Sequence, residues 1–398
     1  MSFKQIAQVD LELNDKFEQA LHLLENTTTN VFVTGRAGTG KSTLLDYFRS
    51  NTGKKVVVLA PTGVAALNVR GQTIHSFFRF GTDITYEKVT KKFSISPHSV
   101  FNQMDMLIID EISMVRADLL DCIDKAMRLY TQNRGPFGGK QVAFFGDLFQ
   151  LSPVVKESER AAFSDKYETS FFYSASVMAN ASMEVVELEN IYRQHDANCI
   201  EILNGVRDNS ITDEQLKELN GRYDPDFVPD PDDFFVTLTS RNNTVKAIDE
   251  HYLKQLPGEQ YSFPATITGE LTRADMPADD MLVLKEGAQV MFLNNDSHGQ
   301  WVNGSMGVVT DIDPDGEFVS VRTTEGDLVD VSAYKWKLNK YVYNKNSKAI
   351  ETEPIGSFEQ IPLRLAWAVT IHKSQGKTFP KLIVDVTGVF AEGQVYVA

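Results

Sequence analysis

The stretch NVFVTGRAGTGKSTLLDYFRS, residues 30–50, decides the fold. It opens with a short apolar run rich in β-branched residues, which is typical of a strand buried in a parallel sheet. It closes, from residue 43, with a segment of helical spacing. Between the two, residues 35–42 match the pattern G-x-x-x-x-G-K-[ST], in the strand-then-helix context that this pattern requires. We therefore predict a parallel α/β sheet with a phosphate-binding loop at a strand end.

The residues of this loop predict a site for Mg-ATP. Glycines let backbone N–H groups converge on the phosphates, and the N-terminus of the following helix adds its dipole. Lys41 is expected to reach the β- and γ-phosphates, and Ser42 to bind Mg²⁺. The alternative, a glycine-rich turn that matches by chance, is disfavoured by the order of strand, loop and helix. The expected nucleotide-binding residues are Gly35, Ala37, Gly38, Thr39, Gly40, Lys41, Ser42 and Thr43.

Two further apolar runs end in polar residues that suit the same site. Asp110 and Glu111 follow the run at residues 106–109, at the strand end where open α/β sheets bind ligands. Asp110 is expected to hold Mg²⁺ through its water shell, and Glu111 to orient and deprotonate the attacking water. Gln150 follows the run at residues 142–145 and can bind both a γ-phosphate and that water, which would make it a catalytic sensor. Read alone, it is a polar loop residue.

Apolar runs with helical segments between them predict an α/β protein with two sheets, one in each half of the chain. We place the first domain at residues 1–180, with a small insert at 76–100, and the second at 181–398. Short alternating strands with Asp-Gly and Glu-Gly turns predict a small antiparallel β unit inserted at about 270–356. The apolar runs lie at residues 30–34, 55–60, 106–109 and 142–145, and then at 234–239, 365–370 and 382–386.

The composition excludes several classes of protein. The net charge is −15, which argues against a protein that coats DNA with a broadly basic surface but leaves room for a local groove. Cys122 and Cys199 are too few and too scattered for a disulfide framework or a zinc cluster. Neither an apolar run of about 18 residues nor a secretory signal is visible. We therefore expect an intracellular protein without a membrane partner.

Short motifs in a fixed order resemble those of superfamily 1, subclass B DNA helicases. The resemblance is closest to the PIF family, with RecD-like helicases second, and covers roughly residues 13–398. Residues 120–141 are similar to the segment that marks the PIF family. The motifs are APTG at 60–63, TIHSF at 73–77, DE at 110–111, GDLFQ at 146–150, YRQ at 192–194 and TIHKSQG at 370–376.

This resemblance implies two RecA-like domains with ATP between them, a short wedge insert in the first and an SH3-like insert in the second. It implies 5′-to-3′ movement along single-stranded DNA, with unwinding of duplex, junction or otherwise structured DNA. Arg193 would reach the γ-phosphate as an arginine finger, and Gly376 would contact the nucleotide. Roles in DNA repair, recombination and telomere maintenance follow, with replication or repair proteins as partners. The compartment would be cytoplasm or nucleoid in a bacterium, and nucleus or mitochondrion in a eukaryote.

The motifs also suggest where DNA lies. Single strands are held by phosphate contacts and by stacking of bases on aromatic side chains. Phe78 and Phe80, in the insert after Phe77, suit either a wedge that splits the duplex or core packing, and Lys91, Lys92 and Phe93 follow them. The expected DNA-binding residues are Thr62, Gly63, Thr73, His75, Phe77, Thr239, Asn242, His372, Lys373 and Ser374.

Two departures from the family pattern leave alternatives open. Phe17 stands where the family usually has a glutamine that reads adenine, and Gln19 is out of register. The sequence also stops at Ala398, before a final motif with a second phosphate-sensing arginine, so we expect a longer natural chain or an impaired enzyme. The rival functions are a RecD-like motor subunit of a nuclease complex, a catalytically impaired single-stranded DNA-binding protein, and an ATP-dependent protein remodeller.

Overall fold

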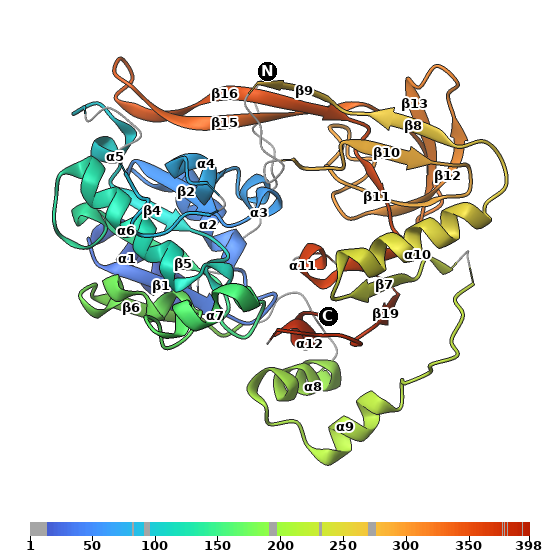
Figure 1. Cartoon of the computed structure of the whole chain (residues 1–398), viewed down its shortest axis with the longest axis horizontal. Helices are drawn as coiled ribbons and strands as arrows, with labels where there is room; N and C mark the ends of the chain where they lie inside the picture. Colours follow the sequence, from blue (N-terminus) through green and yellow to red (C-terminus); the bar gives the residue numbers. More distant parts are fainter. Residues whose placement is uncertain are drawn as a thin grey trace.

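The structure, a computed structural model, consists of two α/β units and one β-rich unit (Figure 1). The first α/β unit, drawn in blue to green, carries the phosphate loop. The β-rich unit and the second, smaller α/β unit are formed by the later part of the chain, in yellow to red. The residues described are 14–81, 83–90, 96–190, 197–230, 233–269, 276–375, 377, 379, 381–391 and 393–398.

The first unit is built on a six-stranded parallel sheet in the order β3-β2-β4-β5-β1-β6. Successive residues of a strand point to opposite faces, so each apolar run serves two cores. Val31 and Val33 pack under helices α1 and α2, whereas Phe32 packs with α6 on the other face. The strands are β1 Asn30–Gly35, β2 Val56–Ala60, β3 Gln72–Thr73, β4 Met106–Ile109, β5 Gln141–Phe145 and β6 Met183–Leu188; the helices are α1 Asp15–Asn26, α2 Lys41–Asn51 and α6 Ala117–Thr131.

The last strand of this sheet corrects the expected domain boundary. β6 pairs in parallel with β1, from Asn30 opposite Met183 to Gly35 opposite Leu188. The first unit therefore extends at least to Leu188, and the boundary that we placed at residue 180 is too early. The alternation of Glu and Val in β6 indicates a half-exposed edge strand, and such a pattern does not say which sheet the strand joins.

The second α/β unit has a three-stranded parallel sheet in the order β18-β7-β19. Two α/β sheets were expected from the sequence, and this is confirmed. The apolar run at 365–370 is divided between the β-rich unit and this sheet. The part in the β-rich unit is β17 Leu363–Leu365. The elements of the second α/β unit are β7 Val236–Thr239, α10 Asn242–Gln255, β18 Ala368–Thr370, α11 Ile371–Ser374 and β19 Leu382–Val384.

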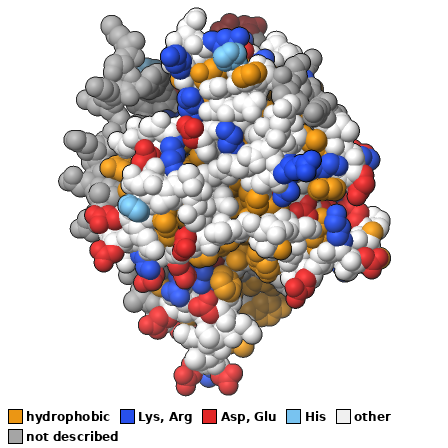
Figure 2. Space-filling model, turned by 90° about the vertical axis from the view of Figure 1, so that its left-hand side faces the viewer, with side chains coloured by type: hydrophobic (Ala, Val, Ile, Leu, Met, Phe, Trp, Pro, Cys, Tyr) orange, Lys and Arg blue, Asp and Glu red, His pale blue; other side chains and the backbone are white. Residues whose placement is uncertain are grey.

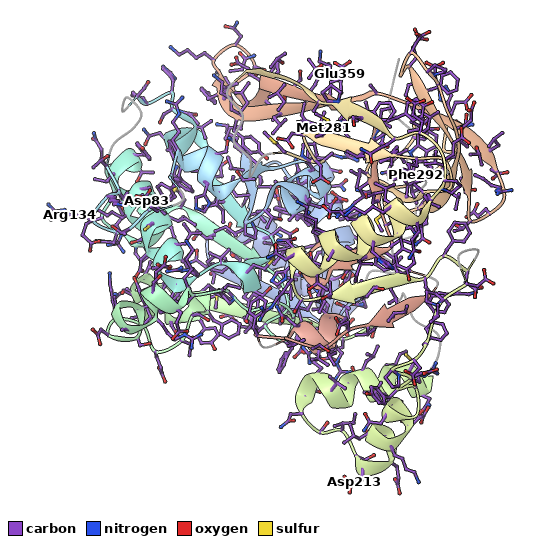
Figure 3. All side chains as sticks on the ribbon, turned by 45° about the vertical axis from the view of Figure 1, so that its right-hand side comes forward. Asp83, Arg134, Asp213, Met281, Phe292 and Glu359 are labelled. Carbon is purple, nitrogen blue, oxygen red and sulfur yellow. The ribbon has the colours of Figure 1, made fainter. Side chains whose placement is uncertain are left out.

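The β-rich unit confirms the predicted antiparallel insert, although it begins earlier than residue 270. Its main sheet has five strands in the order β14-β13-β12-β11-β17, and a second pair joins β8 to β10. Phe292 lies inside this unit, where its ring stacks on Trp301 at 4.9 Å (Figure 3). The strands are β8 Tyr261–Pro264, β10 Met281–Leu284, β11 Gln289–Phe292, β12 Met306–Ile312, β13 Phe318–Thr323 and β14 Leu328–Ser332.

A long hairpin reaches from the β-rich unit across the top of the first unit (Figure 1). Its strands are β15 Tyr334–Asn344 and β16 Ala349–Gln360, and β9 Thr266–Gly269 pairs with β16. The hydroxyl of Tyr341 accepts a hydrogen bond of 3.3 Å from the N–H of Val58 in β2. The ring of Tyr343 stacks on His98. These contacts connect the hairpin, from the second half of the chain, to the first unit.

Helices α8 Ala197–Asp208 and α9 Asp213–Asn220 connect the first sheet to the second. Thr212 and Gln215 form a capping box that starts α9, and Asp213 marks the outer end of this helix (Figure 3). α8 lies closer in, beside the short C-terminal helix α12 Gln394–Val397. Across the described ranges, no helix has the length and apolar character needed to span a membrane.

A buried carboxyl group in α10 makes stability depend on pH. Asp249 accepts a hydrogen bond of 3.1 Å from the N–H of Ala368 in β18. Burial raises the pKa of this carboxyl group to about 7. The folded state therefore holds the proton more tightly than the unfolded chain, in which the pKa of Asp is about 3.9. The stability that this group contributes is fully present below about pH 4 and is lost as the pH rises through about 7.

Asp249→Asn should be more stable than the original protein at pH 8, because asparagine keeps an oxygen acceptor for Ala368 and carries no charge. Its advantage in free energy of unfolding should grow by about 2 kcal/mol between pH 5.5 and pH 8. Denaturant unfolding at both pH values measures this. Glu250→Gln, on the exposed side of the same helix, is the control and should show no such growth. An Asp249→Asn advantage that is the same at both pH values would contradict the raised pKa.

Candidate active site

The phosphate loop lies between β1 and α2, as the sequence predicts. Gly40 caps the N-terminus of α2 with φ of +89°, a left-handed conformation that favours glycine. At Gly35, a Cβ atom would stand 2.5 Å from the carbonyl oxygen of Leu188 in β6. Both positions therefore disfavour larger residues, as expected for a tight phosphate-binding loop.

Lys41 and Ser42 begin α2 at the mouth of this loop. The Lys41 ammonium donates hydrogen bonds to the carbonyl oxygens of Gly35, at 2.6 Å, and Arg36, at 3.0 Å. Burial lowers the pKa of Lys41, and the nearby carboxylates, Asp147 first, oppose that shift. The side chains of Ser42 and Thr43 are exposed. The loop thus presents the Lys41 ammonium and the exposed Ser42 hydroxyl where the phosphates and Mg²⁺ of a nucleotide are expected.

Asp110 and Glu111 directly follow β4 and form a buried acid pair. Burial raises the pKa of Asp110 to about 6 and that of Glu111 to about 7, and the charge of Asp110 adds to the second shift. The raised pKa values indicate that nearby positive charge does not compensate the two carboxylates. A divalent cation would supply that charge. No cluster of three or more potential metal ligands occurs in the part of the chain that the structure describes. A site with one or two carboxylates, a hydroxyl and substrate phosphates is typical of Mg²⁺, and Asp110 and Ser42 fit it.

Gln375, just after α11, connects the second α/β unit to this acid pair. Its side-chain amide donates hydrogen bonds of 2.9 Å to Glu111 Oε2 and of 2.9 Å to Gln150 Oε1. The structure thus brings the predicted base and the predicted sensor together through one residue that was absent from our expected site. The signal lies in the motif at 370–376, in which this glutamine directly follows the predicted DNA-contacting residues His372, Lys373 and Ser374.

The C-terminal residues also lie against the site. A Cβ atom at Gly393 would meet the carbonyl oxygen of Gln150 at 1.8 Å, so the two backbones touch. The Tyr396 hydroxyl bonds to the backbone of Ala37 in the phosphate loop, and burial raises its pKa. Residues 393–398 therefore pack between the loop that carries Gln150 and the phosphate loop.

The predicted DNA-binding residues gather at strand ends of both sheets. Thr62 lies after β2, and its hydroxyl caps the N-terminus of the short helix α3 Gly63–Asn68. Thr73 is the last residue of β3, and its hydroxyl caps the short helix α4 Ile74–Phe78 in the same way. In the second sheet, Thr239 lies opposite Thr370. Asn242 begins α10 and is exposed, as is Lys373 in α11, whereas Ser374 is buried and His372 is half-buried. Exposed Thr62, Asn242 and Lys373 remain the most accessible candidates.

Phe77 corrects our expectation for this surface. Its side chain is only 6% exposed, and its ring contacts Phe78, Phe101 and Tyr341. A ring enclosed in this way offers no free face to a base, so Phe77 belongs to the core. Phe78 is fully buried and Phe80 stacks on it, which favours core packing over a wedge for both.

Some expectations concern other parts of the chain. Phe17 is buried under the sheet in α1, so it contacts the core rather than a nucleotide base. Gln19 is exposed. The remaining predicted residues, Lys91, Lys92, Phe93, Arg193 and Gly376, lie outside the described residues.

Comparisons of this chain with known proteins all point to one family. The sequence profile described as "PIF1-like helicase" matches residues 12–215. The chain is 33% identical to the "ATP-dependent DNA helicase Pif1" of Bdellovibrio bacteriovorus, over 98% of this chain and 85% of that protein. It is 33% identical to the "ATP-dependent DNA helicase PIF1" of Mus musculus, over 93% of this chain. The chain spans only 55% of that mouse protein's length.

Solved structures agree. Bacteroides sp Pif1 in complex with ADP-AlF4 is 39% identical and superimposes with a TM-score of 0.87, covering 97% of this chain and 89% of that one. Bacteroides Pif1 bound to single-stranded DNA is 39% identical with the same coverage, 97% and 89%, and a TM-score of 0.68. The arrangement of units described above is therefore more similar to the first of these two structures than to the DNA-bound one.

Proposed function

Because the chain belongs to the PIF1-like helicase family, we propose that it is an ATP-driven helicase that moves 5′ to 3′ along single-stranded DNA and unwinds duplex or structured DNA. The observation that carries this proposal is the pair of hydrogen bonds from Gln375 to Glu111 and Gln150. The residue that directly follows α11 thus contacts the residues suited to ATP hydrolysis, while Lys373 within α11 is exposed and is a candidate for DNA contact.

The residues of the first unit support a division of roles in ATP hydrolysis. Lys41 binds the phosphates of ATP, and Glu111 orients and deprotonates the attacking water. Ser42 and Asp110 hold Mg²⁺, which neutralises charge on the phosphates. Gln150 senses the γ-phosphate. Arg193 is included in this proposal as the arginine finger because of its YRQ motif alone.

Coupling to movement follows from where these residues lie. In this proposal, ATP draws the two α/β units together into a closed state. ATP can favour that state over ADP only through contacts that ADP does not make. Gln150 and Gln375 are suited to provide such contacts, because Gln375 bonds both to Gln150 and to Glu111. The arginine finger proposed from the YRQ motif would add a further contact. Closure of the two α/β units then shifts α11, with His372 and Lys373, along the DNA strand. Release of phosphate reverses the shift.

The surface is compatible with a local DNA groove. On the face drawn in Figure 2, Lys and Arg side chains lie scattered among Asp and Glu side chains. With a net charge of −15, tight binding cannot come from broad neutralisation of phosphates. Backbone amides, hydroxyls and a few cations at the strand ends remain as the contacts. Because its substrates are DNA and ATP, the protein acts inside the cell. Its partners in this proposal are DNA junctions, structured DNA and replication or repair proteins.

Strand displacement on tailed duplexes tests the proposed activity. With ATP, the full-length protein should displace a strand from a duplex that carries a 5′ single-stranded tail, and should leave blunt and 3′-tailed duplexes intact. Omission of ATP or Mg²⁺ is the control. Preferential displacement from the 3′-tailed duplex would overturn the polarity, and no displacement from any of them would leave a DNA-binding ATPase without helicase activity.

A further inference from the structure

Two basic side chains meet where the β-rich unit joins the second α/β unit. Arg364 lies in β17 between Leu363 and Leu365, which both pack against the core of the β-rich unit. Because successive residues of a strand point to opposite faces, Arg364 points out of this core. It lies directly opposite Met291 of β11, and such cross-strand neighbours share one face of the sheet. Met291 packs with Ile371 of α11, so Arg364 faces the second α/β unit.

Lys377, shortly after α11, reaches the same face from the other unit. Its ammonium lies 3.3 Å from the sulfur of Met291 and donates a hydrogen bond of 3.2 Å to Asn303 Oδ1, in the turn before β12. A Cβ atom at Gly304 would stand 3.8 Å from Cδ of Lys377, so the lysine stem lies over this turn. Arg364 and Lys377 thus both lie beside Met291, one from each unit.

The positive charge of these two side chains is not balanced. None of the ion pairs between described residues includes Arg364 or Lys377. Within the described ranges, the buried Nε of Arg364 has no hydrogen-bond partner. Burial, and after it the charges of Arg364 and Lys373, lower the pKa of Lys377 to about 8. The Asp249 carboxyl group, which interacts electrostatically with Arg364, accepts its hydrogen bond from Ala368 instead. Uncompensated cations at a partly buried seam are unfavourable, and an anion would relieve them.

We propose that Arg364 and Lys377 together bind one phosphate group of the single-stranded DNA. Arginine and lysine are the side chains best suited to hold a phosphate. Gln375 bonds to Glu111 in the first unit, whereas Lys377 turns to the β-rich unit, so the pair lies apart from the nucleotide contacts. Lys373, shortly before Lys377 in the chain, is exposed, so a strand held at α11 passes this pair. The inference rests on the proposed function and extends the DNA contacts to the β-rich unit.

Binding of the full-length protein to a fluorescent oligothymidylate, without nucleotide, tests the site. Arg364→Met and Lys377→Met should each weaken binding at least about fivefold at low salt, because each removes a charged donor to the phosphate. Each phosphate neutralised adds about −0.7 to the slope of log affinity against log salt for single strands. The double variant Arg364→Met/Lys377→Met should therefore have a slope shallower by about 0.7, because both cations serve one phosphate.

Lys254→Met is the control, because Lys254 is an exposed lysine in the last turn of α10 whose ion-pair partner, Glu250, lies on the same helix. It should change neither affinity nor slope. Arg364→Lys keeps a cation and should retain most of the affinity. Without DNA, Lys377→Met should melt at no lower temperature than the original protein, since methionine removes a repelled charge and can pack beside Met291. Affinity of the double variant for a non-hydrolysable Mg-ATP analogue should be unchanged.

Four results would overturn the inference. The first is a lower melting temperature in Lys377→Met with unchanged DNA affinity, which indicates that the lysine only stabilises the seam. The second is a slope shallower by about 1.4 in the double variant, which indicates two separate phosphates. The third is weaker binding of the ATP analogue with unchanged DNA affinity, which indicates that nucleotide phosphates occupy the site. The fourth is unchanged affinity and slope in Lys377→Met, which decides the matter even if Arg364→Met does not fold. Failure of the original protein to bind single-stranded DNA would instead overturn the proposed function.

Discussion

Lys41→Ala is expected to abolish ATP hydrolysis while leaving the protein folded. Lys41 is the cation of the phosphate loop, and its hydrogen bonds to Gly35 and Arg36 hold it over the curl where the phosphates bind. Alanine at the first position of α2 preserves the helix, since it has the highest helix propensity. The rate of phosphate release with saturating single-stranded DNA, together with the melting temperature, measures both parts of the prediction.

Lys54→Ala is a matched control. Lys54 also donates hydrogen bonds to backbone, at 2.7 Å to the carbonyl oxygen of Thr27, but it lies before β2 and away from the phosphate loop. Its loss should lower the melting temperature and spare hydrolysis. Near-normal turnover in Lys41→Ala would remove the ATP-motor interpretation altogether.

Glu111→Gln should still bind Mg-ATP but hydrolyse it at least about 10²-fold more slowly. Glutamine keeps an oxygen that can accept the hydrogen bond from Gln375, so the link between the two units should persist, whereas an amide cannot take a proton from water. Equilibrium binding of Mg-ATP and single-turnover hydrolysis measure the two effects separately. The pKa of Glu111, about 7 before Mg-ATP is bound, is in the range expected for a general base.

Asp110→Asn is the companion variant, because Asp110 is proposed to hold Mg²⁺. It should weaken the dependence of ATP binding on Mg²⁺, unlike Glu111→Gln. If both variants lost nucleotide binding to the same extent, the separate roles assigned to the two acids would be wrong.

Local patterns in the sequence were sufficient for the phosphate loop, the strands that flank it and the acid pair. Each of these depends on residues within one strand and the turn that follows. The loop needs glycine at positions such as Gly35 and Gly40 for steric reasons that any sequence must meet. The apolar runs needed only the pattern of doubly buried strands, and the parallel sheet confirmed them.

Contacts between distant segments could not be predicted in this way. Gln375 and Glu111 are 264 residues apart, and Lys377 and Met291 are 86 apart. Phe77 lies in a motif typical of DNA contact, yet Tyr341 from the β15–β16 hairpin covers its ring. In the same way, the pairing of β6 with β1 placed a polar-looking strand in the first sheet. Such outcomes depend on tertiary packing, which a local pattern does not encode.

The central claim is that contact with single-stranded DNA reaches the hydrolytic residues through α11 and Gln375. The most direct measurement is the rate of ATP hydrolysis by the full-length protein with increasing single-stranded DNA. We predict a low basal rate that rises at least about tenfold and saturates, with the rise largely lost in Gln375→Ala. A rate that is the same with and without single-stranded DNA would contradict the claim.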